Sequence, residues 1–437
     1  MRPSDPIVDI ADQYRAKFRK TLGPVRRIGR EAEFPVVWPD GRGADVSLLW
    51  APLLRQGGLE PVHEDDGLLI GARGRDVAYQ AEVGKATIEL SLGPYDDLWE
   101  LQHGLNRALD RVIRAAEQCG LWVLGYGIQP RSRSSSRLLT PRRHYQAFYQ
   151  AVGMPWLRLT TTAADQTHVD ITRGEVLDAV NGMNLLSGPI IALCANSSVY
   201  AGRAGRYLSG REGFLRELGI HRYGMTPSRF QSFETLIRYL AGYLVYVLPQ
   251  DGGFRRVDMT FLQFADRELR RDPEALFKAF LWHEHYVWNS ARPRVAHSTI
   301  EVRPACQQPP SELMASSALI LGLVEALTQI QAYLSEALGP DPWPAMARYR
   351  KAVIRHGLSA KEPAPGMLSK LADFARDGLA RRGRGEEQYL RPIYDRLSSG
   401  VSPAEGVRTS FRQGGMVELL RRLRIGPELI GAHGHFN

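Results

Sequence analysis

The sequence predicts an α+β protein with an antiparallel sheet and a helical C-terminal portion. Short segments in which apolar and polar residues alternate recur up to about residue 308, which is typical of strands. These segments do not alternate regularly with single crossover helices, as a doubly wound parallel sheet requires. A glycine-containing turn, Glu82-Val83-Gly84-Lys85, can also join two of them as a hairpin. The pattern therefore favours antiparallel pairing.

The predicted strands lie before residue 308 and cover residues 27–37, 77–82, 87–92, 121–128, 164–171 and 297–303. Helical periodicity predicts helices over 96–119, 175–196, 228–247 and 273–282, and amphipathic helices near 311–336, 343–355, 367–382, 387–398 and 416–424. We therefore expect an α+β domain over residues 1–308 and a helical extension over residues 309–437 that packs on the same domain.

Composition and cysteine usage indicate a folded protein in a reducing compartment. The chain has 437 residues, of which 44% are hydrophobic and 24% charged, so it can bury a sizeable core. Cys119, Cys194 and Cys306 are odd in number and lack a CxxC spacing, which argues against a disulfide framework or a thiolate zinc site. No apolar signal segment is apparent in the first twenty residues, and the apolar stretch 314–334 contains Glu325, as expected of a buried helix. We expect a cytoplasmic protein without a membrane span.

The net charge of +9 does not by itself indicate nucleic-acid binding. The excess lies in Arg-rich helical segments such as RYRKAVIRH and LARRGRGEEQYLRPIYDRL, which lack interleaved aromatic residues for stacking on bases. Solvated helix faces explain these segments, and a basic surface also suits small anionic substrates. We expect no nucleic-acid partner.

Four predicted strands carry ionisable residues on one face and apolar residues on the other, because residues two apart in a strand share a face. A single strand of this kind is usually half-exposed, but acids are uncommon on exposed strand faces, so four together predict one shared cavity within residues 1–308. The polar positions are Glu31 and Glu33 in GREAEFPVV, Glu82, Glu89 and Ser91 in AEVGKATIELSL, Gln166, His168 and Asp170 in DQTHVDIT, and His297, Glu301 and Arg303 in AHSTIEVRP.

Buried carboxylates require a compensating positive charge. Without a cation or hydrogen-bond donors, each costs several kcal/mol. Hard divalent cations prefer oxygen ligands, and the predicted set is mainly carboxylates with one histidine. The composition therefore indicates Mg²⁺ or Mn²⁺ rather than zinc.

Six motifs, in this order along the chain, resemble those of the glutamate–cysteine ligases: GREAEF, EVGKATIELSLGP, DQTHVDIT, GPIIALCANSSVYAGRAGRYLSGREGF, STIEVRP and IYDRLSSGVSPAEGV. The resemblance is to the plant and proteobacterial branch and to the relatives of the ergothioneine pathway. It implies a fold shared with glutamine synthetase and the guanidino kinases, an antiparallel sheet bent into a funnel with helices outside. It also implies an ATP-dependent carboxylate–amine ligase in which glutamate becomes a γ-glutamyl phosphate that cysteine attacks.

The resemblance assigns roles to particular residues. It implies metal binding by Glu31, Glu33, Glu82, Glu89, His168 and Glu301. It implies that Arg303, Arg211 and Gln166 bind the acidic substrate, that Asn196, Arg294 and Glu89 contact ATP, and that Arg294 and Arg303 are catalytic. Phosphoryl transfer depends mainly on electrostatic stabilisation, so this inventory suits the chemistry without a protein nucleophile.

Departures from the family pattern leave the substrates open. Val83 stands where proline is usual, and Lys85 and Ser198 also differ from the pattern. The choice between Arg292 and Arg294 for the phosphate contact stays open. Three functions also stay open: a cysteine ligase, a ligase for another acid or amine, and a catalytically silent binding homologue. The sequence does not give the oligomeric state.

Four further features have plainer interpretations. His283 and His285 are predicted to lie on a packed strand edge among aromatic residues, and Cys306 to be a packing residue. Asn196 can cap a helix or face nucleotide. The stretch RSRSSSR lacks the glycine and lysine of a phosphate-binding loop, so a mobile surface loop is predicted.

Overall fold

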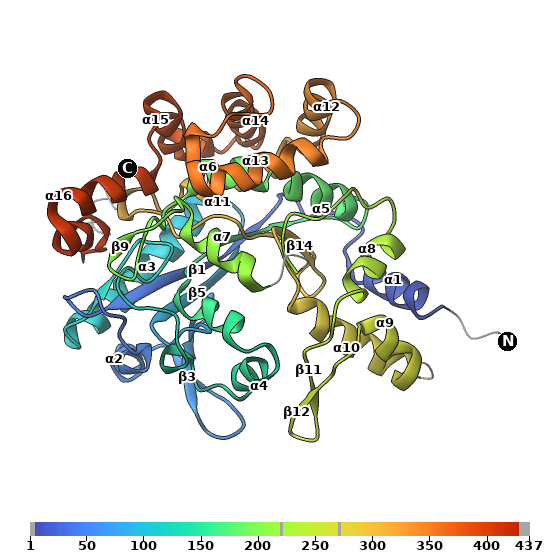
Figure 1. Ribbon diagram of the computed structural model, residues 1–437, viewed down its shortest axis with the longest axis horizontal. Coiled ribbons are helices and arrows are strands. Elements are labelled where there is room, and N and C mark those ends of the chain that lie inside the picture. Colours follow the sequence, from blue (N-terminus) through green and yellow to red (C-terminus); the bar gives the residue numbers. More distant parts are fainter. Residues whose placement is uncertain (1–4, 219–221, 270–271, 428–437) are drawn as a thin grey trace.

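A large antiparallel sheet lies at the centre of the computed structural model, which describes residues 5–218, 222–269 and 272–427. In this part of the chain the sheet has nine strands in the order β14-β15-β7-β1-β5-β4-β3-β2, with β6 beside β1. Helices surround the sheet (Figure 1). The α+β class and the antiparallel pairing are confirmed.

The strands of this sheet are short, apart from the two at its centre. Their bounds are β1 (Ile28–Val37), β2 (Glu60–His63), β3 (Leu69–Arg73), β4 (Val77–Ala81), β5 (Thr87–Tyr95), β6 (Trp122–Val123), β7 (Asp165–Asp170), β14 (Ala291–Arg294) and β15 (Thr299–Val302). Three two-stranded ribbons lie outside it: β8 (Val199–Tyr200) with β9 (Arg203–Ala204), β10 (Tyr223–Gly224) with β13 (Trp288–Asn289), and β11 (Val247–Gln250) with β12 (Gly253–Arg256).

The predicted hairpin is confirmed, because β4 and β5 pair antiparallel on either side of the turn that contains Gly84. The strands β2, β3 and β14 were not predicted. Of the strand predicted over 121–128, only β6 pairs in the sheet. The rest threads between packed segments, and a Cβ on Gly127 would lie 2.6 Å from the Cβ of Cys306, so this backbone touches its neighbour directly.

The helices cover the sheet and form the C-terminal portion. Their bounds are α1 (Pro6–Lys17), α2 (Trp50–Arg55), α3 (Leu98–Gln118), α4 (Arg143–Val152), α5 (Val176–Leu185), α6 (Ser187–Cys194), α7 (Gly210–Leu215), α8 (Phe233–Ala241), α9 (Phe261–Phe264), α10 (Pro273–His285), α11 (Ala315–Glu325), α12 (Leu327–Leu338), α13 (Trp343–His356), α14 (Met367–Arg381), α15 (Arg391–Ser399) and α16 (Pro403–Leu423).

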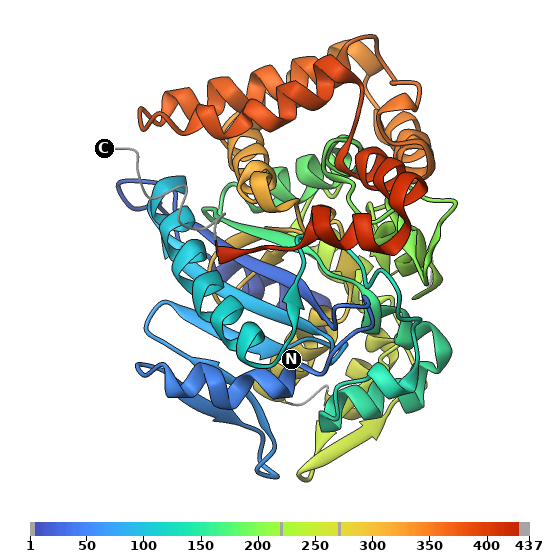
Figure 2. The ribbon, with the colours of Figure 1, turned by 90° about the vertical axis from the view of Figure 1, so that its left-hand side faces the viewer.

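Strand alternation determines which face of the sheet joins the core. On β1, Ala32 and Phe34 are fully buried in the main apolar cluster, together with the apolar face of α3, which crosses the sheet in Figure 2. Helix α11 packs on β7, and α14 packs on α11, so the helices after residue 308 share this core. The division at residue 308 stays a prediction. The opposite face of β1 carries Glu31 and Glu33.

Two predicted long helices are broken. The predicted helix 175–196 bends at Leu186 into α5 and α6, and the predicted helix 311–336 bends at Ala326 into α11 and α12. Among the described residues, no single helix combines the length and apolarity needed to cross a bilayer; two bent pairs, Val176–Leu185 with Ser187–Cys194 and Pro310–Glu325 with Leu327–Leu338, reach that threshold only when joined.

The prediction that His283 and His285 lie on a strand edge is wrong. Both residues belong to the last turn of α10, which begins at Pro273 behind an Asp272 cap. The apolar residues of α10 follow helical rather than strand spacing, and His283 packs flat against Phe261. The aromatic packing around His283 is as expected.

Candidate active site

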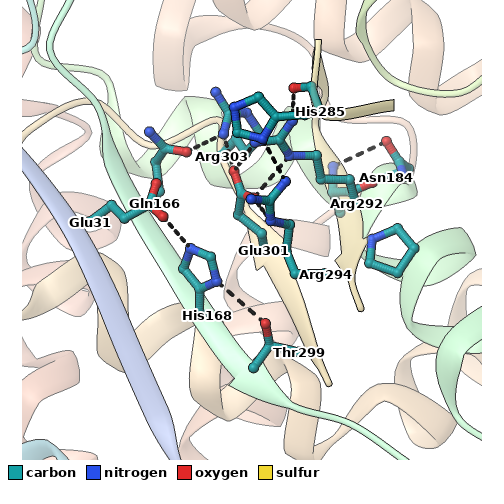
Figure 3. A network of polar contacts seen from close by, with 12 residues as sticks. Glu31, Gln166, His168, Asn184, His285, Arg292, Arg294, Thr299, Glu301 and Arg303 are labelled. Atoms are coloured by element: carbon teal, nitrogen blue, oxygen red, sulfur yellow. Dashed lines mark hydrogen bonds and ion pairs between the residues drawn. The ribbon is translucent and has the colours of Figure 1, made fainter. Parts of the chain in front are cut away.

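The polar faces of four central strands meet on one side of the sheet, and part of this arrangement is drawn in Figure 3. Because neighbouring strands are antiparallel and in register, side chains that face the same way form rows across the sheet. These rows place Glu33 opposite Glu89, Glu31 opposite Gln166, and His168 opposite Glu301.

The six residues predicted to bind metal come together in two groups. The first group is Glu33, Glu82 and Glu89, and the second is Glu31, His168 and Glu301. Within each group, one potential ligand atom per residue lies within 4.8 Å of the others. Strands far apart in the chain supply both groups, as the strand pattern predicts.

The first group consists of crowded and buried carboxylates. Glu33 and Glu89 are 6% and 4% exposed, and among the described residues no arginine or lysine forms an ion pair with Glu33, Glu82 or Glu89. Burial, with repulsion from Glu82, raises the pKa of Glu33 to about 7. Burial and the neighbouring carboxylates also raise the pKa of Glu89 well above its ordinary value. A hard divalent cation fits this oxygen-only set and would relieve the repulsion.

Hydrogen bonds hold the first group in place. Glu33 accepts from the backbone N–H of Ala164 and from the side-chain amide of Gln166, both at 2.7 Å. Glu89 Oε1 accepts from Gln80 at 2.6 Å and from Ser91 at 2.8 Å. These donors fix the carboxylates in place but bring no positive charge, so the group still needs a proton or a cation.

The second group differs, because arginines already meet one of its carboxylates. Glu301 accepts two hydrogen bonds from Arg292, at 2.9 and 3.0 Å, pairs with Arg294 at 3.2 Å and contacts Arg303 (Figure 3). Burial raises the pKa of Glu301, but these three arginines outweigh it and hold the pKa well below its ordinary value. The positive charge expected beside a buried carboxylate is supplied at Glu301 by arginines, and metal binding by Glu301 stays a prediction.

The other two members of the second group, Glu31 and His168, have fewer hydrogen-bond and ion-pair partners than Glu301. His168 Nε2 lies 3.1 Å from Glu31 Oε1, yet this buried nitrogen has no well-aligned hydrogen-bond partner among the described residues. Burial raises the pKa of Glu31, and the neighbouring His168 lowers it to below its ordinary value. A carboxylate and an imidazole nitrogen are thus available here, and a cation at this group must share Glu301 with the arginines.

The predicted arginines lie around these groups. Arg303 donates to Gln166 and Glu301, so two predicted substrate-binding residues touch each other. Arg211, the second residue of α7, is buried beside the first group and pairs with Glu212 at 2.8 Å. Arg303 and Arg211 both line the cavity described next.

The geometry does not decide between Arg292 and Arg294. Arg292 lines the cavity, and its guanidinium also donates to the backbone oxygen of His285. Arg294 lies two residues further along β14, 3.1 Å from the ring nitrogen Nδ1 of His285. Both guanidinium groups contact Glu301, so both are close to the second group.

Asn196 is not brought to the cavity. Its side chain is fully buried and donates to the backbone oxygens of Gly125 and Gln307, at 3.0 and 2.8 Å. The structure gives this residue a framework role, because it ties two neighbouring segments together, and a direct contact with ATP has no support here. Cys306 is buried as predicted, and burial raises the pKa of its thiol.

Two cavities open on either side of the carboxylate groups. The first has a volume of about 310 Å³ and reaches Glu33, Glu82, Glu89 and Arg211. The second, of about 320 Å³, is lined by His168 and His297, by Arg19 and Arg27, and by apolar residues of β1 and β5. Glu31 lines both cavities, so the two spaces meet at the ligand groups.

Aromatic residues that the sequence analysis missed form much of the first cavity's wall. They are Tyr145, Trp156, Tyr223, Tyr286 and Trp288, with His144 and His285 beside them. These residues lie on helices or in segments too short to show the alternation of a strand. Only the clustering of aromatic residues in these segments could have indicated a cavity wall. Burial and Arg142 lower the pKa of His144 to about 3, and burial with Arg292 and Arg294 lowers that of His285, so both rings are neutral at pH 7.

A reaction that joins a carboxylate to an amine through an acyl phosphate needs a cation site, arginines for the anionic groups and a space sheltered from water. The site offers potential metal ligands, arginines and a lined cavity, a combination that fits an ATP-dependent carboxylate–amine ligase. The chain belongs to glutamate-cysteine ligase family 2 (GCS2), whose family model matches residues 27–423.

Known relatives agree with this assignment. The chain is 29% identical to the chloroplastic glutamate–cysteine ligase of Brassica juncea over 367 residues, which cover 80% of this chain and 69% of the relative. It is also 29% identical to the corresponding ligase of Arabidopsis thaliana, over 79% of this chain and 68% of the relative. Similarity to known glutamate–cysteine ligases thus extends over most of the chain and is not confined to the six motifs.

Two solved structures share the fold at low sequence identity. A bifunctional glutathione synthetase from Pasteurella multocida superposes with a TM-score of 0.55 at 12% identity, over 98% of this chain and 54% of that chain. A glutamate–cysteine ligase from Francisella tularensis in complex with AMP gives a TM-score of 0.54 at 10% identity, over 96% and 91%. The chain thus spans about half of the bifunctional protein. The sheet architecture implied by the motifs is confirmed.

Proposed function

We propose that this ligase forms γ-glutamylcysteine from glutamate, cysteine and ATP. One observation carries the proposal: two cavities meet at two adjacent groups of potential metal ligands, and Glu31 lines both cavities. Such a site can hold an amino acid on one side and a nucleotide on the other, with the reacting carboxylate and phosphate between them. The relatives named glutamate–cysteine ligase support the choice of substrates.

We place the amino acids in the first cavity. Arg211 and Arg303 line it, and a planar guanidinium meets a carboxylate through two parallel hydrogen bonds. Its aromatic wall includes Trp156 and Tyr223, which exclude water and so protect an acyl phosphate from hydrolysis. The second cavity is proposed for ATP: Arg19 and Arg27, which pair with Asp170 of the same lining, would share that carboxylate with phosphates, and Leu92 offers an apolar surface.

The metal is proposed to be Mg²⁺ or Mn²⁺. Glu33, Glu82 and Glu89 would hold one ion, and Glu31 with His168 would hold another, sharing Glu301 with the arginines. When bound, such ions neutralise charge on the phosphate oxygens during phosphoryl transfer. The donor set contains oxygen and a single imidazole, which matches the preference of these ions.

The side chains supply the rest of the chemistry. An oxygen of the γ-carboxylate attacks the γ-phosphorus and ADP leaves; the amine nitrogen then attacks the acyl carbon and phosphate leaves. Arg292, Arg294 and Arg303 surround Glu301 in the second group, and their proposed role is to stabilise the negative charge of the first step, since electrostatic stabilisation is the main catalytic demand. The neutral ring of His285 holds Arg294 in place.

Another amine is the second candidate, and one observation favours it. Val83, which replaces the proline usual in the family motif, lines the first cavity, so the departure lies where an amine substrate would contact the protein. The reaction class is the same, and only the nucleophile differs. We also propose that the protein works in the cytoplasm on small molecules, as the cysteine usage and the dispersed basic residues suggest.

The test is ADP release by the purified protein with Mg²⁺, ATP and glutamate, supplied with cysteine or with each of several other amines. Cysteine-dependent ADP release with stoichiometric γ-glutamylcysteine is the expected result. Turnover with a different amine alone would support the second candidate. Metal-dependent ATP binding without turnover on any amine would overturn both and indicate a catalytically silent homologue.

A further inference from the structure

A third cavity, of about 390 Å³, lies behind helix α7, away from the carboxylate groups. Its lining includes four arginines and no acidic residue among the described positions: Arg133, Arg158, Arg203 and Arg206. The proposed reaction uses none of these side chains. Arg133, Arg203 and Arg206 are exposed and Arg158 is half-buried, so the space carries a positive potential that favours an anion.

Three of the four arginines have no carboxylate partner. Arg158 pairs with Glu217 at 2.7 Å, whereas Arg133, Arg203 and Arg206 form no ion pair within the described residues. Aromatic rings hold two of the guanidinium groups in place, since Arg206 lies over Tyr207 and Arg158 over Phe214. A guanidinium positioned in this way offers a fixed set of donors to an anion.

The cavity is a built feature rather than a gap between loose loops. Its rim joins the RSRSSSR stretch to the β8–β9 ribbon, because Ser134 donates its backbone N–H to the Tyr200 hydroxyl at 2.7 Å and Gly202 donates to the Pro130 oxygen at 2.9 Å. Arg408 on α16 donates to the backbone oxygens of Gly205 and Tyr207 and braces the ribbon. The RSRSSSR stretch, predicted to be a mobile surface loop, is thus tied to its neighbours by hydrogen bonds.

The third cavity shares a wall with the first. Along this wall consecutive residues line opposite cavities: Arg158 and Leu159, Gly210 and Arg211, Phe214 and Leu215. A ligand in the third cavity therefore lies one residue away from a side chain of the proposed substrate site.

Contacts across this wall are close. The backbone N–H of Arg211 donates to Ser197 Oγ at 3.1 Å, and Ser197 lines the third cavity. A Cβ on Gly210 would lie 2.3 Å from the Ser197 oxygen, so the two backbones touch without space between them. A displacement of Ser197 is therefore transmitted to Arg211.

We propose that the third cavity is an effector site for a small polyanion, a metabolite that carries phosphate groups or several carboxylates. Binding there acts through Ser197 on Arg211 and changes the affinity for the acidic substrate; this coupling rests on the proposed function, whereas anion binding itself does not. Because coupling between two sites is reciprocal, glutamate also changes the affinity for the polyanion.

The binding test uses the full chain without nucleotide or divalent metal, at low ionic strength, titrated calorimetrically with pyrophosphate and, separately, with citrate. The double variant Arg203→Ala/Arg206→Ala removes two exposed arginines of the cavity. The control, Arg75→Ala/Arg348→Ala, removes two exposed arginines that form no ion pair within the described chain and do not line the third cavity, so the change in net charge is the same. Thermal unfolding checks that both variants are folded.

We expect the cavity variant to bind the better of the two anions at least about tenfold more weakly than the wild type, because each charged hydrogen bond lost weakens binding by about that factor. The control should bind as the wild type does. Preference for pyrophosphate identifies a phosphate-bearing ligand and preference for citrate a polycarboxylate. Equal weakening in both variants, or no binding to the wild type, overturns the proposal.

The coupling test measures the KM for glutamate with and without the bound anion. A shift is expected in the wild type and in the control variant but not in the cavity variant, whose kcat without the anion should be unchanged. Anion binding with no shift in KM would overturn the coupling and leave the binding site standing. Absence of any turnover would count against the proposed function instead, since the calorimetric result does not depend on activity.

Discussion

Glu33 on β1 and Glu89 on β5 face each other directly across the central pair of strands, both are buried, and neither forms an ion pair with an arginine or lysine of the described chain. Two carboxylates in this position are stable as neighbours only if they keep a proton or gain a cation. Burial and the neighbouring carboxylates raise the pKa of both groups, which favours a retained proton when no cation is bound. Four predictions follow from this and related contacts.

Metal affinity should rise with pH up to about 7. Burial raises the pKa of Glu33 to about 7, so below that pH a proton must leave before the carboxylate can bind a cation. For one released proton, the apparent affinity for Mn²⁺ falls about tenfold per pH unit below 7, and the Glu33 contribution levels off above it. Calorimetric titrations between pH 5.5 and 8 measure this. The Glu33→Gln variant should bind Mn²⁺ weakly at every pH, whereas the control Glu60→Gln should behave as the wild type. A wild-type affinity for Mn²⁺ that does not change with pH would contradict the prediction.

Loss of Glu301 should unfold the protein more readily than loss of Glu31. The Glu301→Ala variant leaves Arg292, Arg294 and Arg303 without their shared carboxylate, and breaking a buried ion pair of this kind costs about 3–5 kcal/mol. Within the described residues Glu31 forms no ion pair with an arginine, so Glu31→Ala should lower the free energy of unfolding by less than about 1 kcal/mol.

Urea denaturation compares these two variants, and both should lack turnover. From the strand pattern alone, loss of either carboxylate is expected to leave the fold intact. A Glu301→Ala protein as stable as the wild type would agree with that expectation and contradict the present prediction. Glu301→Gln, which keeps an acceptor oxygen, should lie between the wild type and Glu301→Ala in stability.

Replacing Arg211 should weaken binding of the acidic substrate. Arg211 lines the first cavity near Glu33, and Glu212 keeps its second partner Arg350 when Arg211 is removed, so the fold should hold. The KM for glutamate in Arg211→Ala is expected to rise about 10- to 100-fold, the equivalent of one or two charged hydrogen bonds. Steady-state kinetics measure it, with the exposed Arg137→Ala as control. An unchanged KM would remove Arg211 from the substrate site.

Replacing Asn196 should affect stability rather than nucleotide binding. Asn196→Ala leaves the backbone oxygens of Gly125 and Gln307 without their donor in a fully buried place, which costs about 1–3 kcal/mol. The KM for ATP of the folded variant should match the wild type. A tenfold higher KM for ATP with unchanged unfolding would instead establish the nucleotide contact implied by the family motif.

The sequence predicted the sheet best where strand period was clear. Glu31 and Glu33 alternate with Ala32 and Phe34, so the two faces of β1 followed directly from the pattern. The pattern failed for residues 121–128, where a close backbone contact at Gly127 replaces strand pairing, and for His285, which α10 carries one turn beyond its predicted end. In both cases, packing between distant segments outweighed a short local pattern.

By itself, the sequence determined the antiparallel α+β class and the shared polar faces of Glu31, Glu33, Glu89, His168 and Glu301, because alternation along a strand fixes which side chains share a face, while the family motifs implied the metal-ligand role and added Glu82. Only the tertiary structure decided how these residues divide into two groups, that three arginines neutralise Glu301, and that Asn196 points into the framework. The reason is physical: strand register, helix ends and the paths of loops depend on contacts between segments far apart in the chain, and no local period encodes them.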